Sequence, residues 1–247
     1  MADLSADAMS VLRTLFIAGD KSTVKSHPPH ATVARHAAVF QELIDGGFIT
    51  EEPFNNFDVW LYRGTSKIAA LKEGDIVFVS GAAGAVGSVV VQIAKIKGHT
   101  VIGSCGGADK VAFLKSIGCD EVIDYKAEKD LTAALNRVAP KGIDVYFENV
   151  GGEHMDAALA CARPFARFAL CGMISQYNAT GEMYGIKNLI MAVGKSLKLE
   201  GFIVSNHFHH LPDFLQDMSG WINDGKLKWV ETVDEGIENA PGAFLKL

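Results

Sequence analysis

Short apolar runs alternate with stretches of helical periodicity from about residue 75 onward. The runs with the length and β-branched content of strands cover residues 76–79, 100–105, 121–125, 143–150, 167–171 and 199–204. Between and after them, apolar residues recur with helical spacing over residues 88–97, 108–117, 130–138, 153–161, 186–197 and 211–224. Strands separated by such helices are typical of a parallel sheet covered on both faces. The pattern predicts an α/β fold with a doubly wound parallel sheet over residues 74–247.

Residues 1–73 have a different pattern. Helical spacing over residues 1–18 and 32–45 is followed by two short strand-like runs, 48–51 and 59–63, as in a hairpin. This order is typical of a winged helix–turn–helix module. The segment has seven basic and nine acidic residues, whereas nucleic-acid binding requires a clustered basic face. We therefore expect a small, mainly helical module for protein interaction or dimerisation, although a gene fusion onto a truncated domain also fits.

Composition restricts the location and the class of protein. Of 247 residues, 49% are hydrophobic, and the formal net charge of −6 gives no attraction to nucleic acid or to an anionic membrane. The uncharged run 76–94 is as long as a membrane span, but its glycines, serines and glutamine favour a buried strand–turn–helix. The four cysteines include no CxxC pair, which argues against structural zinc and a disulfide framework. We expect a cytoplasmic protein with no metal site and no membrane segment.

A run of small residues, GAAGAVG at positions 81–87, separates the first predicted strand from its helix. A strand, a glycine-rich turn and a helix in this order form the phosphate-binding corner of a dinucleotide-binding (Rossmann) fold. Small residues at 82–84 would let backbone approach a pyrophosphate, and Gly87 would let the helix pack close to its strand. The helix N-terminus would attract the anion. The sequence therefore predicts a dinucleotide site at this corner.

The end of the second strand indicates which dinucleotide. Sites for NAD usually place an acidic residue there to bind the ribose 2′-hydroxyl, but here Cys105 is followed by Gly106 and Gly107. Lys110 lies one helical turn beyond and suits a 2′-phosphate, while Asp109 falls at a helix start, where acidic residues are common. This arrangement predicts NADP(H) as the cofactor.

Several longer motifs resemble those of one family. They are LKEGDIVFVSGAAGAVGSVVVQIAKIKG, KVAFLKSIGCDEVIDYK, YFENVGGEHMDAAL, CGMISQYNATG and LEGFIVSNHF. With them, residues from about 70 to 247 resemble the cofactor-binding half of the medium-chain dehydrogenase/reductase superfamily. Within it they resemble the zinc-free branch of prostaglandin reductases, leukotriene B4 12-hydroxydehydrogenases, quinone and alkenal/enone double-bond reductases and curcumin reductases. The resemblance implies hydride transfer from NADPH to the β-carbon of an α,β-unsaturated ketone or aldehyde.

The resemblance also implies three groups of cofactor-binding residues. Those along the pyrophosphate would be Gly84, Ala85 and Val86. Those at the 2′-phosphate would be Gly106, Lys110 and Tyr125, with Lys110 as a charge and Tyr125 as a hydroxyl donor. Those around the nicotinamide and its ribose would be Asn149, Cys171, Gly172, Ile174, Phe202, Ile203 and Val204.

Tyr177, in the SQYN motif, matches the family's active-site tyrosine. Its phenol would donate a hydrogen bond to the substrate carbonyl as enolate charge develops. Structural alternatives stay open at three of these positions. Tyr125 could be ordinary packing, Asn149 could simply form a turn, and Tyr177 could be a surface or core residue. A histidine cluster at 207, 209 and 210 has no partner spacing for a metal and favours a solvated face.

The chain departs from the family at both ends. Family members have an N-terminal catalytic domain that folds as a partly open β-barrel, which residues 1–73 do not resemble, and a last strand that returns to it, which would follow Leu247. Three hypotheses stay open: a reductase of small-molecule enones or quinones, an NADP(H)-responsive regulatory protein, and an inactive hybrid. An uncovered nicotinamide edge would leave apolar surface, which predicts a homo-oligomer.

Overall fold

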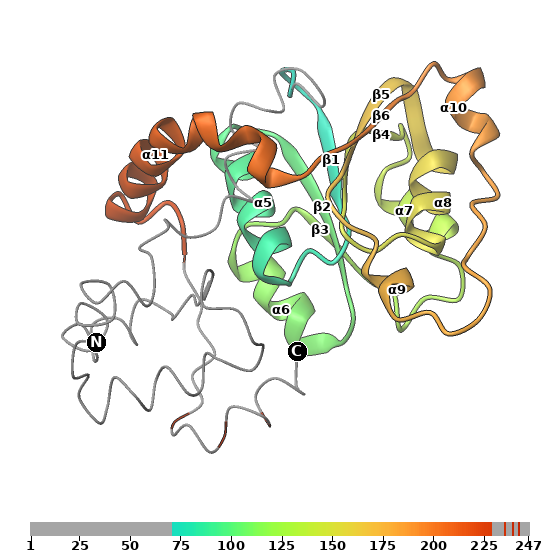
Figure 1. Ribbon diagram of the computed structural model, residues 1–247, viewed down its shortest axis with the longest axis horizontal. Coiled ribbons are helices and arrows are strands. Elements are labelled where there is room, and N and C mark those ends of the chain that lie inside the picture. Colours follow the sequence, from blue (N-terminus) through green and yellow to red (C-terminus); the bar gives the residue numbers. More distant parts are fainter. Residues whose placement is uncertain (1–70, 229–234, 236–238, 240–241, 243–247) are drawn as a thin grey trace, which may run out of the picture. The chain divides into compact units, whose positions relative to one another are not determined.

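We analysed a computed structural model of the chain, which describes residues 71–228, 235, 239 and 242 (Figure 1). The helical module with its hairpin, predicted for residues 1–73, lies outside the described residues except for its last three. The predicted boundary between residues 73 and 74 remains a prediction.

Strands and helices alternate through the described part (Figure 1). The strands are β1 (Ile76–Val79), β2 (Thr100–Cys105), β3 (Glu121–Asp124), β4 (Ile143–Glu148), β5 (Ala162–Leu170) and β6 (Lys198–Gly201). The helices are α5 (Ala85–Ile96), α6 (Ala108–Ser116), α7 (Leu131–Val138), α8 (Glu153–Cys161), α9 (Ile174–Tyr177), α10 (Ile190–Gly194) and α11 (Leu211–Asn223), and a 3₁₀ helix, η2 (Val204–His210), precedes α11.

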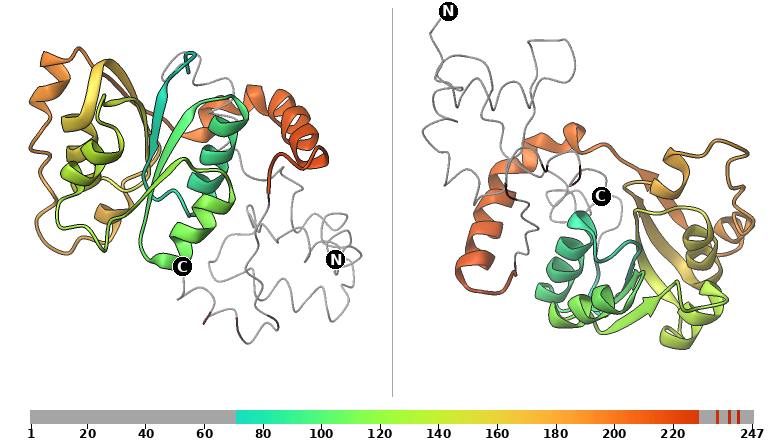
Figure 2. Two further views of the ribbon diagram at one scale, coloured as in Figure 1. Left: turned by 180° about the vertical axis from the view of Figure 1, so that it is seen from behind. Right: turned by 90° about the horizontal axis from the view of Figure 1, so that it is seen from below.

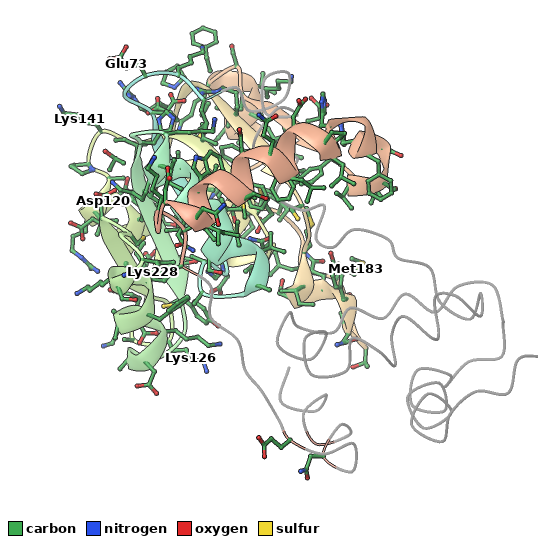
Figure 3. The ribbon with its side chains drawn as sticks, turned by 90° about the vertical axis from the view of Figure 1, so that its left-hand side faces the viewer. Glu73, Asp120, Lys126, Lys141, Met183 and Lys228 are labelled. Carbon is green, nitrogen blue, oxygen red and sulfur yellow. The ribbon has the colours of Figure 1, made fainter. Side chains whose placement is uncertain are left out.

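The six strands form one parallel sheet in the order β3-β2-β1-β4-β5-β6. Helices α5 and α6 cover one face, and α7 and α8 cover the other (Figures 1 and 2). In Figure 3, Glu73, Asp120 and Lys141, which precede strands, lie toward the upper end of the sheet, and Lys126, which follows β3, lies toward its lower end. The predicted doubly wound α/β fold is confirmed, and its strand order reverses between β1 and β4.

Alternating side chains of the central strands fill two separate cores. Val77 and Val79 of β1 pack under α5 and α6, whereas Phe78 packs under α7 and α8. Strand β4 divides in the same way, with Phe147 on the first side and Tyr146 on the second. Because strands buried on both faces need apolar residues at every position, these strands appear in the sequence as continuous apolar runs.

A third apolar cluster holds α11 against α5. Phe214 and Met218 of α11 pack on Val89 and Ile93 of α5. Gln92 of α5 exchanges two hydrogen bonds with the backbone of Lys228, at 3.1 and 2.7 Å, and so fixes the chain after α11. Among the described residues, no helix combines the length and the apolar character needed to cross a membrane.

The second half of the domain differs from the sequence prediction in its short elements. The helix predicted over 186–197 is reduced to α10, because the Asp156 carboxylate accepts the backbone N–H groups of Lys187 and Asn188, at 2.9 and 2.8 Å, before the helix begins. Strand β5 starts directly after α8, and its register shifts near Phe165, which has a positive φ of 65°. Strand β6 ends at Gly201 instead of residue 204, and α9 was not predicted.

The corner between β1 and α5 requires close contact between a helix and a turn. Helix α5 begins at Ala85, three residues before the predicted start, with Gly84 as its N-cap. A Cβ atom on Gly87 would lie 2.5 Å from the carbonyl oxygen of Gly81 and 2.7 Å from the Cα of Ala82. Both neighbours are backbone atoms, so only glycine lets α5 approach the turn this closely.

We predict that Gly87→Ala destabilises the protein by about 2–3 kcal/mol, because the added methyl group overpacks against backbone that cannot move away. Gly220 of α11 is the matched control, since it is also inside a helix but a Cβ there meets no described atom within 4 Å. Gly220→Ala should raise the free energy of unfolding by roughly 0.5–1 kcal/mol. Chemical denaturation measures both changes, and equal effects of the two substitutions would contradict the packing argument.

Candidate functional site

The N-terminus of α5 is open to an anion. Gly84, Ala85 and Val86, predicted to lie along a pyrophosphate, form the N-cap and first turn of α5. The Gly84 cap has no side-chain hydrogen bond, and the first turn contains no acidic residue. Gly84 and Ala85 are exposed, and the first N–H groups of a helix point outward without helical partners. These features suit a phosphate group that approaches the backbone closely.

The end of β2 carries a second candidate anion site, centred on Gly106. A Cβ atom there would lie 2.9 Å from the hydroxyl oxygen of Tyr125 and 2.9 Å from Cε of Lys126. The side chains of Tyr125 and Lys126 therefore lie over Gly106, and a larger residue there would have to displace their ends. Lys110 is exposed in the first turn of α6, whose N-cap is Gly107. The described structure thus brings the predicted Gly106, Tyr125 and Lys110 to one end of the sheet.

The sequence analysis did not include Lys126 in this group. Its stem lies over Gly106 beside the phenol of Tyr125. Its backbone N–H donates to Asp124 Oδ1 at 3.1 Å, and the same oxygen accepts the N–H of Gly107 at 3.0 Å. Asp124 therefore fixes the turn after β3 to the turn after β2. In the sequence, only the position of Lys126 directly after Tyr125 in the same motif indicated that Lys126 belongs to this group.

Asn149 follows β4, at the point where the strand order reverses. Its side-chain amide donates to the carbonyl oxygen of Ser80, which follows β1, at 2.7 Å, and its backbone N–H donates to Ser80 Oγ at 2.9 Å. Both bonds cross the point between β1 and β4 where ligands usually bind in doubly wound folds. Asn149 therefore does more than form a turn, because its side chain also links the ends of β1 and β4.

Glu148 precedes Asn149 and is completely buried. Its Oε1 atom accepts hydrogen bonds from Ser80 Oγ at 2.8 Å and from the N–H groups of Val150 and Gly151 at 2.6 and 2.8 Å. Its backbone carbonyl accepts the N–H groups of Cys171 and Gly172, both at 3.0 Å. The ends of β1, β4 and β5 are thus fixed by one residue.

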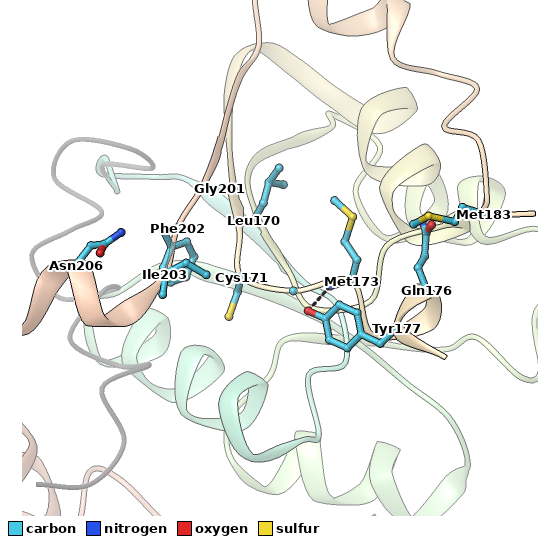
Figure 4. A pocket seen from close by; sticks show the side chains of 11 residues that line it. Leu170, Cys171, Met173, Gln176, Tyr177, Met183, Gly201, Phe202, Ile203 and Asn206 are labelled. Atoms are coloured by element: carbon cyan, nitrogen blue, oxygen red, sulfur yellow. Dashed lines mark hydrogen bonds between the residues drawn. The ribbon is translucent and has the colours of Figure 1, made fainter. Parts of the chain in front are cut away.

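A pocket of about 570 Å³ opens beside the ends of β5 and β6 (Figure 4). Five predicted site residues line it: Cys171, Gly172, Tyr177, Phe202 and Ile203. Ile174 and Val204, also predicted here, begin α9 and η2 and are not among its lining residues. The sequence analysis missed the other lining residues, which are Leu170, Met173, Gln176, Met183, Gly201 and Asn206.

The hydroxyl group of Tyr177 has a fixed place at the pocket wall. Its oxygen accepts the backbone N–H of Met173 at 3.0 Å, the dashed line in Figure 4. A Cβ atom on Gly172 would lie 2.8 Å from the same oxygen. The phenol is 63% exposed, and its own O–H is left to donate to another group. The lining is otherwise mainly apolar.

The segment that carries Met183 is tied to α8 by one buried carboxylate. Asp156 accepts the hydroxyl of Tyr184 at 2.8 Å as well as the two N–H groups that precede α10. This hydrogen bond, more than burial, raises the pKa of Tyr184 to about 12. The lining residue Met183 is therefore held next to a neutral, hydrogen-bonded tyrosine.

Two further observations concern thiols and metals. The four cysteines form no disulfide bonds; Cys105, Cys119 and Cys161 are buried, and Cys171 is partly exposed at the pocket. Burial raises the pKa of Cys119 to about 12 and that of Cys161 to about 11, so both are thiols at neutral pH. Within the described residues, no three His, Cys, Asp or Glu side chains gather as metal ligands would.

Comparisons with known proteins agree with this architecture. Residues 85–220 match the family model described as zinc-binding dehydrogenase. The chain is 46% identical over 187 residues to an NADP(+)-dependent 2-alkenal reductase of Nicotiana tabacum, which covers 75% of this chain and 54% of that protein. It is 43% identical over 185 residues to prostaglandin reductase 1 of Rattus norvegicus, covering 74% of this chain and 56% of that protein.

A solved structure has the same fold. The crystal structure of CurA in complex with NADPH from Vibrio vulnificus superimposes with a TM-score of 0.70 at 42% identity, covering 78% of this chain and 58% of that chain. The chain spans about half the length of the curated relatives it matches. It belongs to the zinc-binding dehydrogenase family and corresponds to the cofactor-binding half of the zinc-free reductase branch of medium-chain dehydrogenases/reductases.

Proposed function

We propose that this protein binds NADPH and takes part in reducing the activated carbon–carbon double bond of a small enone or quinone. The observation that carries the proposal is an apolar pocket with one fixed hydroxyl, that of Tyr177, next to the point where the strand order reverses. The names of the relatives support it, since they include an alkenal reductase and a prostaglandin reductase.

The residues present fit this cofactor. The uncapped N-terminus of α5 suits the pyrophosphate, where Gly84, Ala85 and Val86 would approach it. The cover over Gly106 suits a 2′-phosphate, because Lys110 and Lys126 supply positive charge and Tyr125 supplies a hydroxyl. No carboxylate follows β2 directly to compete for that position. The nicotinamide would then lie toward Asn149 and the pocket.

Several residues around the nicotinamide remain part of this proposal. Cys171, Gly172, Phe202 and Ile203 would border it, since they line the pocket. Ile174 would contribute through its backbone, because its N–H donates to the carbonyl oxygen of Asn149 at 3.1 Å. Val204, which begins η2, remains a weaker candidate because it lies outside the lining.

Tyr177 would be the catalytic residue. When bound, NADPH would supply the hydride for the β-carbon of the substrate, and the proton for its α-carbon would come from solvent. Negative charge develops on the substrate carbonyl oxygen, and the O–H of Tyr177 would donate to it. The Met173 N–H donates to the phenol oxygen and so strengthens the phenol as a hydrogen-bond donor.

We also propose a domain boundary, a cellular location and a class of substrate. A boundary between residues 73 and 74, a cytoplasmic location and a small-molecule substrate would agree with the fold and with four cysteines that form no disulfide. An NADP(H)-responsive regulatory protein or an inactive hybrid is less favoured, because the relatives are named as reductases. Turnover of an enone separates the reductase from both of these alternatives.

We also propose a homo-oligomer, because apolar side chains at the pocket mouth are exposed. Met183 is 69% exposed and Ile203 is 65% exposed, and both line the pocket. Burial of such a surface against a second copy would remove it from water. Sedimentation velocity should give a mass above that of one 26.5 kDa chain, and a monomer at every concentration would contradict this.

We predict that the unchanged protein binds NADPH more tightly than NADH, and that Lys110→Ala removes most of the difference. Loss of a charge-assisted contact should weaken NADPH binding by about 1.5–3 kcal/mol and leave NADH binding nearly unchanged. Fluorescence titration of both cofactors measures this. Lys115→Ala is the matched control, because Lys115 is exposed in the last turn of the same helix. Equal losses for NADPH and NADH would refute the 2′-phosphate assignment.

We predict that Tyr177→Phe spares NADPH binding and lowers NADPH oxidation by a simple enone roughly 100-fold, as loss of an oxyanion donor does. Gly172→Ala keeps the hydroxyl but places a methyl group where it lies, so turnover should also fall. Absorbance of the reduced cofactor follows both reactions. A Tyr177→Phe variant as active as the unchanged protein would leave Tyr177 without a catalytic role.

A further inference from the structure

The phenol of Tyr125 is enclosed between two residues from distant parts of the chain. On one side lies Gly106, where a Cβ atom would come within 2.9 Å of the Tyr125 hydroxyl and 3.0 Å of its Cζ. The other neighbour is His154, whose ring meets the Tyr125 ring edge-on, with centroids 5.2 Å apart and an interplanar angle of 81°. Edge-to-face contact is a favoured geometry for aromatic rings. The side chain of Tyr125 is therefore restricted although it is 39% exposed.

His154 is placed by the other half of the sheet. It is the second residue of α8, which begins after Gly151 and Gly152, two glycines with positive φ angles of 78° and 57° that follow β4. Tyr125 follows β3, an edge strand that lies three positions from β4 in the sheet order. The contact thus crosses two strands, β2 and β1, and links the turn after β4 to the candidate anion site at the end of β2.

The imidazole supplies shape at this place and no charge. His154 is 6% exposed, and burial lowers its pKa to about 4, so the ring is neutral at physiological pH. Its Nε2 atom has no hydrogen-bond partner among the described residues. A core leucine would satisfy the packing of α8 without burying an unpaired nitrogen, which is costly. Compared with an aliphatic side chain, the aromatic ring of His154 adds the edge-to-face contact with Tyr125.

We propose that His154 is a positioning residue for cofactor selection, which holds the Tyr125 hydroxyl over Gly106, where the 2′-phosphate of NADPH is read. This inference rests on the proposed function. Without the imidazole, the Tyr125 side chain can turn toward solvent, and ordering it again reduces the affinity for the ligand that uses its hydroxyl. NADH has no 2′-phosphate and makes no such use of Tyr125. The effect of His154 is thus expected on one cofactor only.

The test compares two substitutions that fill the same space. His154→Phe keeps an aromatic edge against Tyr125, and His154→Leu removes it. Titration should show NADPH dissociation constants raised about two- to tenfold by His154→Leu and within about twofold of the unchanged protein for His154→Phe. The NADH constants should be unchanged in both variants. Met155→Ala, at a buried neighbour in α8, is the control for destabilisation alone and should not alter the ratio of the two constants.

A double-mutant cycle with Tyr125→Phe identifies the route of the effect. Once the hydroxyl is absent, His154→Leu should add no further loss of NADPH affinity. An NADPH preference that is undiminished in His154→Leu, equal losses for both cofactors, or an undiminished loss in the Tyr125→Phe background would each overturn the inference. An unchanged protein that does not prefer NADPH would instead overturn the proposed function, and the role of His154 with it.

Discussion

The carboxylate of Glu148 is the constraint on which the candidate site depends. A fully buried carboxylate is costly unless it is hydrogen-bonded, and here Oε1 accepts three donors from the ends of β1 and β4. The backbone carbonyl of the same residue holds Cys171 and Gly172, after β5. The ends of three adjacent strands are therefore fixed relative to one buried group. Glu148 therefore positions both Asn149 and the part of the pocket wall that Cys171 and Gly172 form.

This fixed point explains how a mainly apolar pocket holds one oriented hydroxyl. Gly172 is held by Glu148, and the absence of a side chain on Gly172 leaves room for the Tyr177 oxygen, which Met173 then binds. The orientation of the phenol thus comes from backbone N–H groups, which are more rigid than side chains. Helix α8, which follows this point, holds two further tyrosines. His154 contacts the ring of Tyr125, and Asp156 accepts a hydrogen bond from the hydroxyl of Tyr184.

Local pattern predicted the fold well and the site in part. The strand–glycine–helix corner and the six strands follow from residues close together in the sequence, where periodicity and turn chemistry act. The role of Asn149 came from the family resemblance instead. The predicted helix over residues 186–197 was too long because Asp156, 31 and 32 residues before Lys187 and Asn188, binds the N–H groups of these two residues. Lys126, Met183 and the contact of His154 with Tyr125 depend on loops that meet only in three dimensions. The hydrophobic periodicity of the sequence gives no information about contacts between such distant loops.

The two ends of the candidate site differ in how complete they are within the described residues. At the end of β2, Tyr125 and Lys126 lie over Gly106, and these described residues would supply the proposed contacts with a 2′-phosphate. At the substrate end, Tyr177 is mostly exposed. A hydrogen bond to a developing oxyanion is much weaker in water than in a site that excludes it. In the function proposed above, the contacts with the 2′-phosphate would come from described residues, whereas fast turnover would require a cover over Tyr177. A measured affinity for NADPH would therefore not by itself establish catalysis.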